Sequence, residues 1–229
     1  ISRIFKMNGN AVIAIYKEEK IRFKLIDSLG NVWYNDYDVN TLSERIKSFY
    51  EFTKQSIRCR TNKIDKVIPE LNDDLSDFIN INKKLAAYIQ NSCGNRFFGN
   101  LSTRCSKLFP TMRNVGIWVS PRNINKDFIT PEDMVYCEYD NDDINYVGDK
   151  KPSVDSPIQL KIYKNCKHIN YMIHGHAFIK NTETTNNYFL CGDWREADEV
   201  IQFIKNKNFG AINLKNHGFL LYSDNLENL

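Results

Sequence analysis

Two of the four histidines of this chain stand close together in the stretch Asn170-Tyr-Met-Ile-His-Gly-His176. It lies within residues 169–179, whose apolar and aromatic composition is typical of a strand. Residues two apart in a strand face the same side of the sheet, so we expect the imidazoles of His174 and His176 to point at one ion. Gly175 between them leaves the opposite face open for close packing. The pair therefore predicts two ligands of a Zn²⁺ site.

A third candidate ligand is His217, in the hydrophobic stretch 211–221, which we interpret as a strand interrupted by a glycine. The remaining histidine, His168, stands in a polar stretch and is interpreted as a surface residue. Paired histidines on a strand are more often ordinary side chains than ligands. The prediction of a metal site therefore depends on the sequence around them.

Other short motifs accompany the histidines. They are G-N-L-S-T-R at 99–104, V-S-P-R-N at 119–123, I-T-P-E-D-M-V at 129–135, K-P-S-V-D-S-P at 151–157 and N-H-G at 216–218. Together they resemble the class II aldolase and adducin family, in which G-N-x-S-x-R, T-P-[ST]-G, L-T-P-E-D-[LI]-V, K-P-S-S-E, H-x-H and N-H-G follow one another in this order. The resemblance covers most of the chain after about residue 71, and ordered agreement is far more specific than any single motif.

The resemblance implies an α/β fold with three α/β/α layers around a mostly antiparallel sheet. It also implies that His174, His176 and His217 hold Zn²⁺ or a similar divalent metal, and that the protein is a homotetramer with sites between subunits. In such a site the ion polarises a substrate carbonyl and stabilises the enediolate formed when a carbon–carbon bond breaks.

The proton-transferring carboxylate of the family is a glutamate where this chain has Asp155. The aspartate side chain is one methylene, or about 1.5 Å, shorter. Either the backbone lies closer to the metal and Asp155 transfers the proton, or the change marks a different or lost reaction. Asp155 is our candidate catalytic residue.

The family binds the substrate phosphate with loops whose positions here are Asn100, Ser120, Arg122, Asn123 and Ser153. Val154 replaces a family serine and has no hydroxyl to donate. Asn123 can adopt the left-handed conformation of the glycine that it replaces. Arg122 is either a compensating anion ligand or an ordinary surface arginine. We therefore expect a substrate with an anionic group, either a phosphate or a carboxylate.

Residues 1–70 carry no motif with recognisable chemistry and are predicted to be an accessory region of strands plus a helix. Alternation from Ala11 to Tyr37 predicts a meander of about three strands. Thr41 and Glu44 fit a capping box that opens a helix running to about Cys59. A polar linker follows, and apolar spacing over 75–89 predicts a second helix at the start of the main domain, residues 71–229.

Composition excludes several classes of partner. The 31 basic and 28 acidic side chains are interspersed, which argues against nucleic acid. No apolar run approaches the roughly 20 residues that cross a bilayer, so we expect no membrane partner and a cytoplasmic location.

The six cysteines form no C-x-x-C pair and are expected to be reduced and mostly buried. A start at Ile1 rather than methionine fits a processed product or a piece of a longer polypeptide.

These features predict a metal-dependent lyase (aldolase), or an epimerase or decarboxylase-like enzyme, that acts on a phosphorylated or acidic sugar derivative. The alternative is a non-catalytic, adducin-like binding or assembly module, which shares the fold without the chemistry. The complete set of histidines favours the enzyme. A cupin-type metal barrel is less favoured because the expected glutamate does not closely follow the H-x-H pair.

Overall fold

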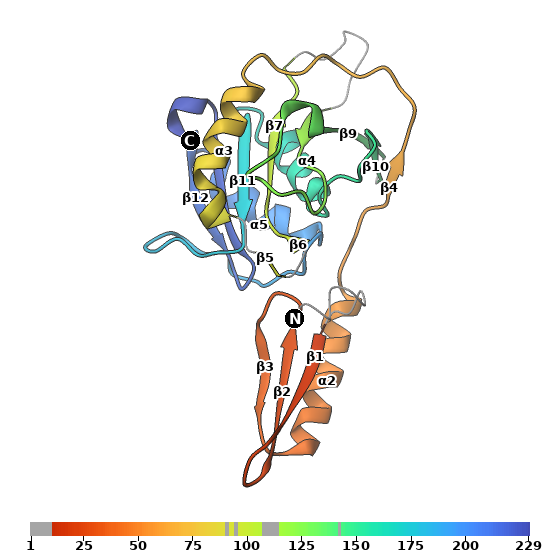
Figure 1. The fold of residues 1–229 in the computed structure, drawn as a ribbon, viewed down its shortest axis with the longest axis vertical. Helices are drawn as coiled ribbons and strands as arrows, with labels where there is room; N and C mark the ends of the chain where they lie inside the picture. Colours follow the sequence, from red (N-terminus) through yellow and green to blue (C-terminus); the bar gives the residue numbers. More distant parts are fainter. Residues whose placement is uncertain (1–10, 90–91, 94–95, 107–114, 142) are drawn as a thin grey trace. The chain divides into compact units, whose positions relative to one another are not determined.

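The computed structural model describes residues 11–89, 92–93, 96–106, 115–141 and 143–229. The chain divides into two compact units, a smaller one that ends at Ser56 and a larger one from Ile57 to Leu229. Figure 1 shows the elements of both units along the sequence. Each unit is described by itself.

The smaller unit is an antiparallel meander packed against one helix (Figure 1). Its elements are β1 (Ala11–Lys17), β2 (Ile21–Asp27), β3 (Val32–Asp36) and α2 (Val39–Lys54). Leu25, Tyr34, Leu42 and Phe49 are its buried core, and the ring of Trp33 packs edge to face on that of Phe49. The predicted meander and helix are confirmed.

Helix α2 begins and ends earlier than the sequence predicts. Its N-cap is Asp38, whose carboxylate accepts hydrogen bonds from the backbone N–H groups of Asn40 and Thr41. Thr41, the predicted cap, instead donates its hydroxyl to the Asp38 carboxylate. The cap prediction is therefore wrong, because an aspartate three residues upstream satisfies the first free N–H groups. The helix ends at Lys54 rather than near Cys59.

The larger unit is built on an eight-stranded sheet with the order β12-β13-β11-β7-β8-β9-β10-β4. All neighbouring strands are antiparallel except β10 and β4, which are parallel. The strands are β4 (Thr61–Lys63), β7 (Asn100–Arg104), β8 (Gly116–Val119), β9 (Val135–Asp140), β10 (Asp143–Val147), β11 (Tyr171–Gly175), β12 (Phe209–Leu214) and β13 (Gly218–Ser223). Strand β4 thus lies within residues 60–66, the polar stretch that the sequence suggests as a linker.

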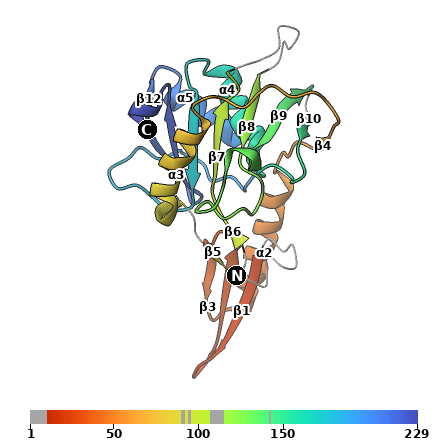
Figure 2. The same cartoon turned by 45° about the horizontal axis from the view of Figure 1, so that its top comes forward.

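Helices cover both faces of this sheet (Figure 2). One face packs on α3 (Leu75–Ile89), and the other on α4 (Ser156–Asn165) and α5 (Arg195–Ile204). A short hairpin of β5 (Ser92–Cys93) and β6 (Arg96–Phe97) and two 3-10 helices, η1 (Pro131–Asp133) and η2 (Leu226–Asn228), complete the unit. This arrangement confirms the predicted α/β fold with a mostly antiparallel central sheet.

Alternation along the central strands supplies two hydrophobic cores. Ile117 and Val119 belong to the core under α4 and α5, whereas Trp118 between them belongs to the core under α3. The apolar spacing that predicts a helix over 75–89 is confirmed, because α3 spans those residues and buries Phe78 and Ile79. Within the described ranges, no helix combines the length and the apolar character needed to span a bilayer.

Candidate active site and metal centre

The three candidate metal ligands meet at one end of neighbouring strands. His174 is on β11, His176 lies one residue beyond its end, and His217 lies in the turn that joins β12 to β13. Antiparallel pairing of Gly175 with Phe219 brings the end of β11 beside that turn. The sequence predicts that His176 and His217 lie inside strands, and this prediction is wrong for both. Strand β11 ends at Gly175, and His217 lies in the turn of the hairpin formed by β12 and β13.

The geometry of the imidazoles matches a shared ion. One ligand nitrogen from each of the three rings lies within 4.8 Å of the others. The ring centroids are 5.0 Å apart for His174 and His176, 4.8 Å for His174 and His217, and 5.2 Å for His176 and His217. Three imidazoles at Zn–N distances of about 2.0–2.1 Å and tetrahedral angles would place their centroids about 5.2 Å apart. The observed separations agree.

His174 has a fixed tautomer. Its Nδ1 lies 2.8 Å from the carbonyl oxygen of Phe219, which can only accept, so Nδ1 carries the proton and Nε2 presents a lone pair. Nε2 is buried and has no hydrogen-bond partner among the described residues. Burial and the neighbouring His217 lower the pKa of His174 to about 4, which keeps the ring neutral. A neutral ring with a buried, unused lone pair is the state that binds a metal.

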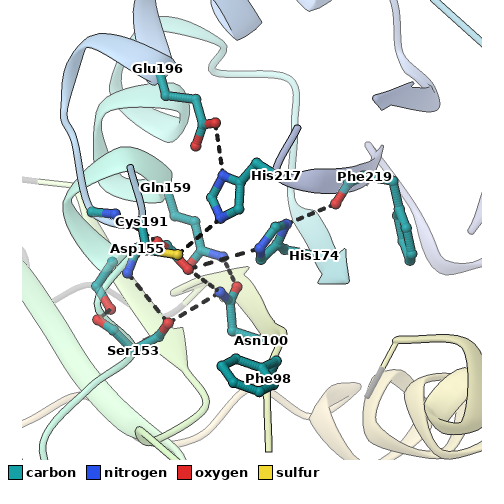
Figure 3. A network of polar contacts seen from close by, with 12 residues as sticks. Phe98, Asn100, Ser153, Asp155, Gln159, His174, Cys191, Glu196, His217 and Phe219 are labelled. Atoms are coloured by element: carbon teal, nitrogen blue, oxygen red, sulfur yellow. Dashed lines mark hydrogen bonds and ion pairs between the residues drawn. The ribbon is translucent and has the colours of Figure 1, made fainter. Parts of the chain in front are cut away.

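His217 is oriented by a carboxylate, as Figure 3 shows. Its Nδ1 lies 2.9 Å from Oε1 of Glu196, and both side chains are buried. Burial raises the pKa of Glu196. Although burial opposes it, the facing carboxylate raises the pKa of His217. A proton is thus held between Nδ1 of His217 and Glu196, while Nε2 of His217 faces away from Glu196. This arrangement is typical of carboxylate–histidine–zinc groups.

His176 is held by an aromatic neighbour. Its ring stacks on Phe98 with centroids 5.1 Å apart. Burial, together with the nearby His174 and His217, lowers the pKa of His176 well below its ordinary value. Lys126 anchors the same segment, because its Nζ donates to the carbonyl oxygens of Phe98 at 2.9 Å and Ile124 at 3.2 Å. The three imidazoles are therefore each held in place, His174 by the carbonyl of Phe219, His217 by Glu196 and His176 by the ring of Phe98.

Asp155 lies beside the histidines (Figure 3). It occupies the N-cap position of α4 but makes no capping hydrogen bond with its side chain. Instead Oδ1 accepts from the N–H of Gly192 at 3.0 Å, and Oδ2 accepts from Nδ2 of Asn100 at 3.0 Å. Oδ2 is also 4.0 Å from Nε2 of His174. The buried carboxylate is therefore fixed at a short distance from the candidate metal ligands.

The structure brings together some of the predicted anion ligands. Nδ2 of Asn100 lies 3.1 Å from Oγ of Ser153 and shares the same network as Asp155. Ser120 is buried next to them, and its backbone carbonyl accepts from the N–H of Ser153. These residues form one continuous polar group at the site.

The two other predicted anion ligands occupy exposed positions in the loop after β8. Asn123 has a positive φ of 63°, so it does adopt the left-handed conformation expected at this position. Its Oδ1 accepts from the N–H of Phe97, which ties the loop to β6. Arg122 is exposed, and its backbone N–H donates to the carbonyl of Lys151. Their side chains are not in the hydrogen-bonded group of Asn100, Ser153 and Asp155.

Four residues of the site are not predicted from the sequence. Gln159, one turn into α4, donates to the side-chain carbonyl of Asn100. Glu196 fits a capping box with Asp193, but its carboxylate faces His217 and the N-cap of α5 is Trp194. Lys126 is fully buried, and burial lowers its pKa to about 8. Cys191 also reaches the site. No local pattern marks any of them, because each contact joins segments distant in sequence.

We predict that Glu196→Gln weakens metal binding about 10–100-fold, the usual cost of losing a partner that orients a ligating histidine. Glutamine keeps the size and an acceptor oxygen but removes the charge that holds the Nδ1 proton. Competition with a chromogenic chelator measures the change. Asp198→Asn on the same helix is the matched control, because Asp198 is exposed and pairs with Lys161 outside the site. Equal affinities for Glu196→Gln and Asp198→Asn would contradict the role of Glu196.

The fold and the site together define an α/β domain with a candidate metal centre, and known proteins share parts of its sequence and its fold. Residues 77–182 match the model of the Class II Aldolase and Adducin N-terminal domain. The L-fuculose phosphate aldolase of Methanococcus maripaludis is 27% identical over 170 residues, which cover 64% of this chain and 83% of that protein. Over residues 77–182 the chain is thus similar to the N-terminal domain of class II aldolases and adducin.

Solved structures show the same fold. A structure of an L-fuculose 1-phosphate aldolase superposes with a TM-score of 0.52 at 19% identity, covering 70% of this chain and 79% of the other. A sugar-phosphate aldolase from Thermotoga maritima gives a TM-score of 0.50 at 11% identity, covering 67% and 88%. At these identities the likeness concerns the architecture alone.

Proposed function

We propose that this protein is a divalent-metal-dependent lyase of the class II aldolase type, or a related epimerase or decarboxylase, that acts on a phosphorylated or acidic sugar derivative. The observation that carries the proposal is the convergence of three imidazoles beside the buried carboxylate of Asp155. Zn²⁺ or a similar ion suits a set of three nitrogen ligands, because catalytic zinc sites combine three protein ligands with an open position. The homotetramer implied by the family belongs to the same proposal.

When bound, the ion supplies Lewis-acid polarisation of a substrate carbonyl. The chain supplies the proton transfer. Oδ2 of Asp155 is the candidate base, because it points toward the histidines while Oδ1 is held by the N–H of Gly192. The donor from Asn100 fixes the direction of Oδ2. Proton transfer by a carboxylate positioned in this way contributes to catalysis of carbon–carbon bond cleavage.

Binding of an anionic group is assigned in this proposal to Asn100, Ser120 and Ser153. Their amide and hydroxyl groups are the donors that a phosphate or carboxylate accepts from. The names of the similar proteins, L-fuculose phosphate aldolase and sugar-phosphate aldolase, favour a phosphorylated sugar. Arg122 lies at an exposed position of the neighbouring loop, from which a flexible cation can contact a bound anion.

The test is a substrate screen on metal-loaded protein. Ketose 1-phosphates and acidic sugars are incubated with the protein, and aldehyde release is measured with a coupled dehydrogenase. We expect cleavage that a chelator abolishes and added metal restores, with the unphosphorylated ketoses as matched controls. A metal-loaded, folded protein that neither cleaves, epimerises nor decarboxylates any compound would support the non-catalytic, adducin-like module instead.

A further inference from the structure

Cys191 lies beside the metal centre but has no place in the proposed mechanism. Its Sγ is 3.3 Å from Nε2 of His217, the nitrogen that Glu196 leaves available for a metal. Sγ, a carboxylate oxygen of Asp155 and a ring nitrogen of His217 all lie within 4.8 Å of one another. Figure 3 shows the thiol pointing at His217. The two groups of possible ligands, Asp155 with Cys191 and His217, and the three histidines, therefore share His217.

The distance between sulfur and nitrogen suits two ligands of one ion. A tetrahedral zinc with bonds of about 2.3 Å to sulfur and about 2.0–2.1 Å to nitrogen places these two atoms about 3.5 Å apart. The observed 3.3 Å is close to that value. In the absence of an ion, a thiol proton shared with Nε2 accounts for the same contact. An arriving ion would take the place of that proton between the two atoms.

The backbone around the thiol is fixed rather than loose. Gly192 has a φ of 77°, which an L side chain rarely adopts, and a Cβ there would lie 2.9 Å from the carbonyl oxygen of Val154. Its N–H donates to Oδ1 of Asp155, and the N–H of Asp193 closes a turn onto the carbonyl of Leu190. This turn holds Cys191 with its side chain toward His217.

A second feature independently indicates a ligand here. His174 is only 3% exposed, and its Nε2 lacks a hydrogen-bond partner in the described part of the chain. Leaving a buried nitrogen lone pair unsatisfied costs about 1–3 kcal/mol. An ion held by His174 and His217 would remove that cost, and His217 is the residue that the thiol contacts.

We propose that Cys191 is a fourth protein ligand of the metal in the resting site, an inference that rests on the metal centre of the proposed function. On binding, the thiol releases its proton to solvent and the thiolate sulfur bonds to the ion. Thiolate ligands select soft or borderline ions such as Zn²⁺, Co²⁺ and Cd²⁺ over Mg²⁺ and Mn²⁺. Expansion to five ligands, which zinc sites permit, leaves a position for substrate.

Cobalt spectroscopy tests the inference. The full chain is stripped with a chelator and one equivalent of Co²⁺ is added under reducing conditions. We expect visible ligand-field bands together with a near-ultraviolet sulfur-to-cobalt charge-transfer band. Cys191→Ser should keep the visible bands and lose the near-ultraviolet band. Cys59→Ser is the matched control and should keep both, because Cys59 is a half-buried cysteine that packs against the hydrophobic core.

The outcomes separate the two proposals. Visible cobalt bands without a charge-transfer band in the unaltered protein would overturn the thiolate ligand and leave the histidine centre standing. The absence of all cobalt bands would overturn the metal centre itself. A charge-transfer band that persists in Cys191→Ser would also exclude Cys191. Because the first spectrum uses the unaltered protein, misfolding of a variant does not obscure the result, and Cys191→Ala provides a second substitution.

Discussion

Replacing His174 and His176 together with alanine is expected to reduce the bound divalent metal from about one ion per chain to a trace, because a catalytic centre of this type depends on three protein ligands. Of the proposed ligands only His217 and Cys191 remain, fewer than the three protein ligands of such a site. Elemental analysis after dialysis against buffer measures the metal content. His174→Gln with His176→Gln keeps polar side chains of similar size, which limits any loss of packing at the buried His174.

The control for this experiment is His168→Ala. His168 precedes the start of β11, whereas His174 and His176 lie at the end of that strand, and Nε2 of His168 contacts the carbonyl oxygen of Lys207. This variant should therefore bind metal as the parent does. Circular dichroism establishes that the variants are folded. Stoichiometric metal in either double variant would exclude the histidines as the principal ligands.

Asp155→Asn is expected to lower turnover about 10²–10⁴-fold, the range for a lost general acid or base. Metal content should change little, because the three imidazoles remain. An asparagine oxygen can still accept from the N–H of Gly192, but its NH₂ group would then face the Nδ2 of Asn100. Some rearrangement of that contact is expected, so the metal content and fold of the variant are measured alongside kcat and KM.

Asp155→Glu is the sharper companion to this variant. Oδ2 of Asp155 already lies 4.0 Å from Nε2 of His174, and the longer side chain moves the carboxylate about 1.5 Å further out. Because glutamate is the family residue here, Asp155→Glu should preserve or raise activity. Asp149→Asn, a change at a fully exposed carboxylate, is the control. Parent turnover in Asp155→Asn would transfer the acid–base role to another group.

Local patterns were sufficient for much of the architecture. The alternation in residues 11–37 corresponds to strands β1 to β3, and the helical spacing in 75–89 corresponds to α3. Each pattern places apolar side chains on the side of the element that packs against its hydrophobic core. Helix ends were less predictable. The N-cap of α2 is Asp38 rather than the predicted Thr41, since several nearby side chains can accept hydrogen bonds from the same free N–H groups.

The family resemblance, the order of the motifs and the candidate histidines could be predicted from the sequence, because they depend on residue identity and spacing alone. Which groups surround the histidines depends on the tertiary structure. Glu196 reaches His217 across 21 residues, and Asn100 reaches Asp155 across 55. Cys191 and Lys126 enter the site in the same way. Such contacts depend on where packing places loops and helix ends over the sheet, and no local pattern of residues records that placement.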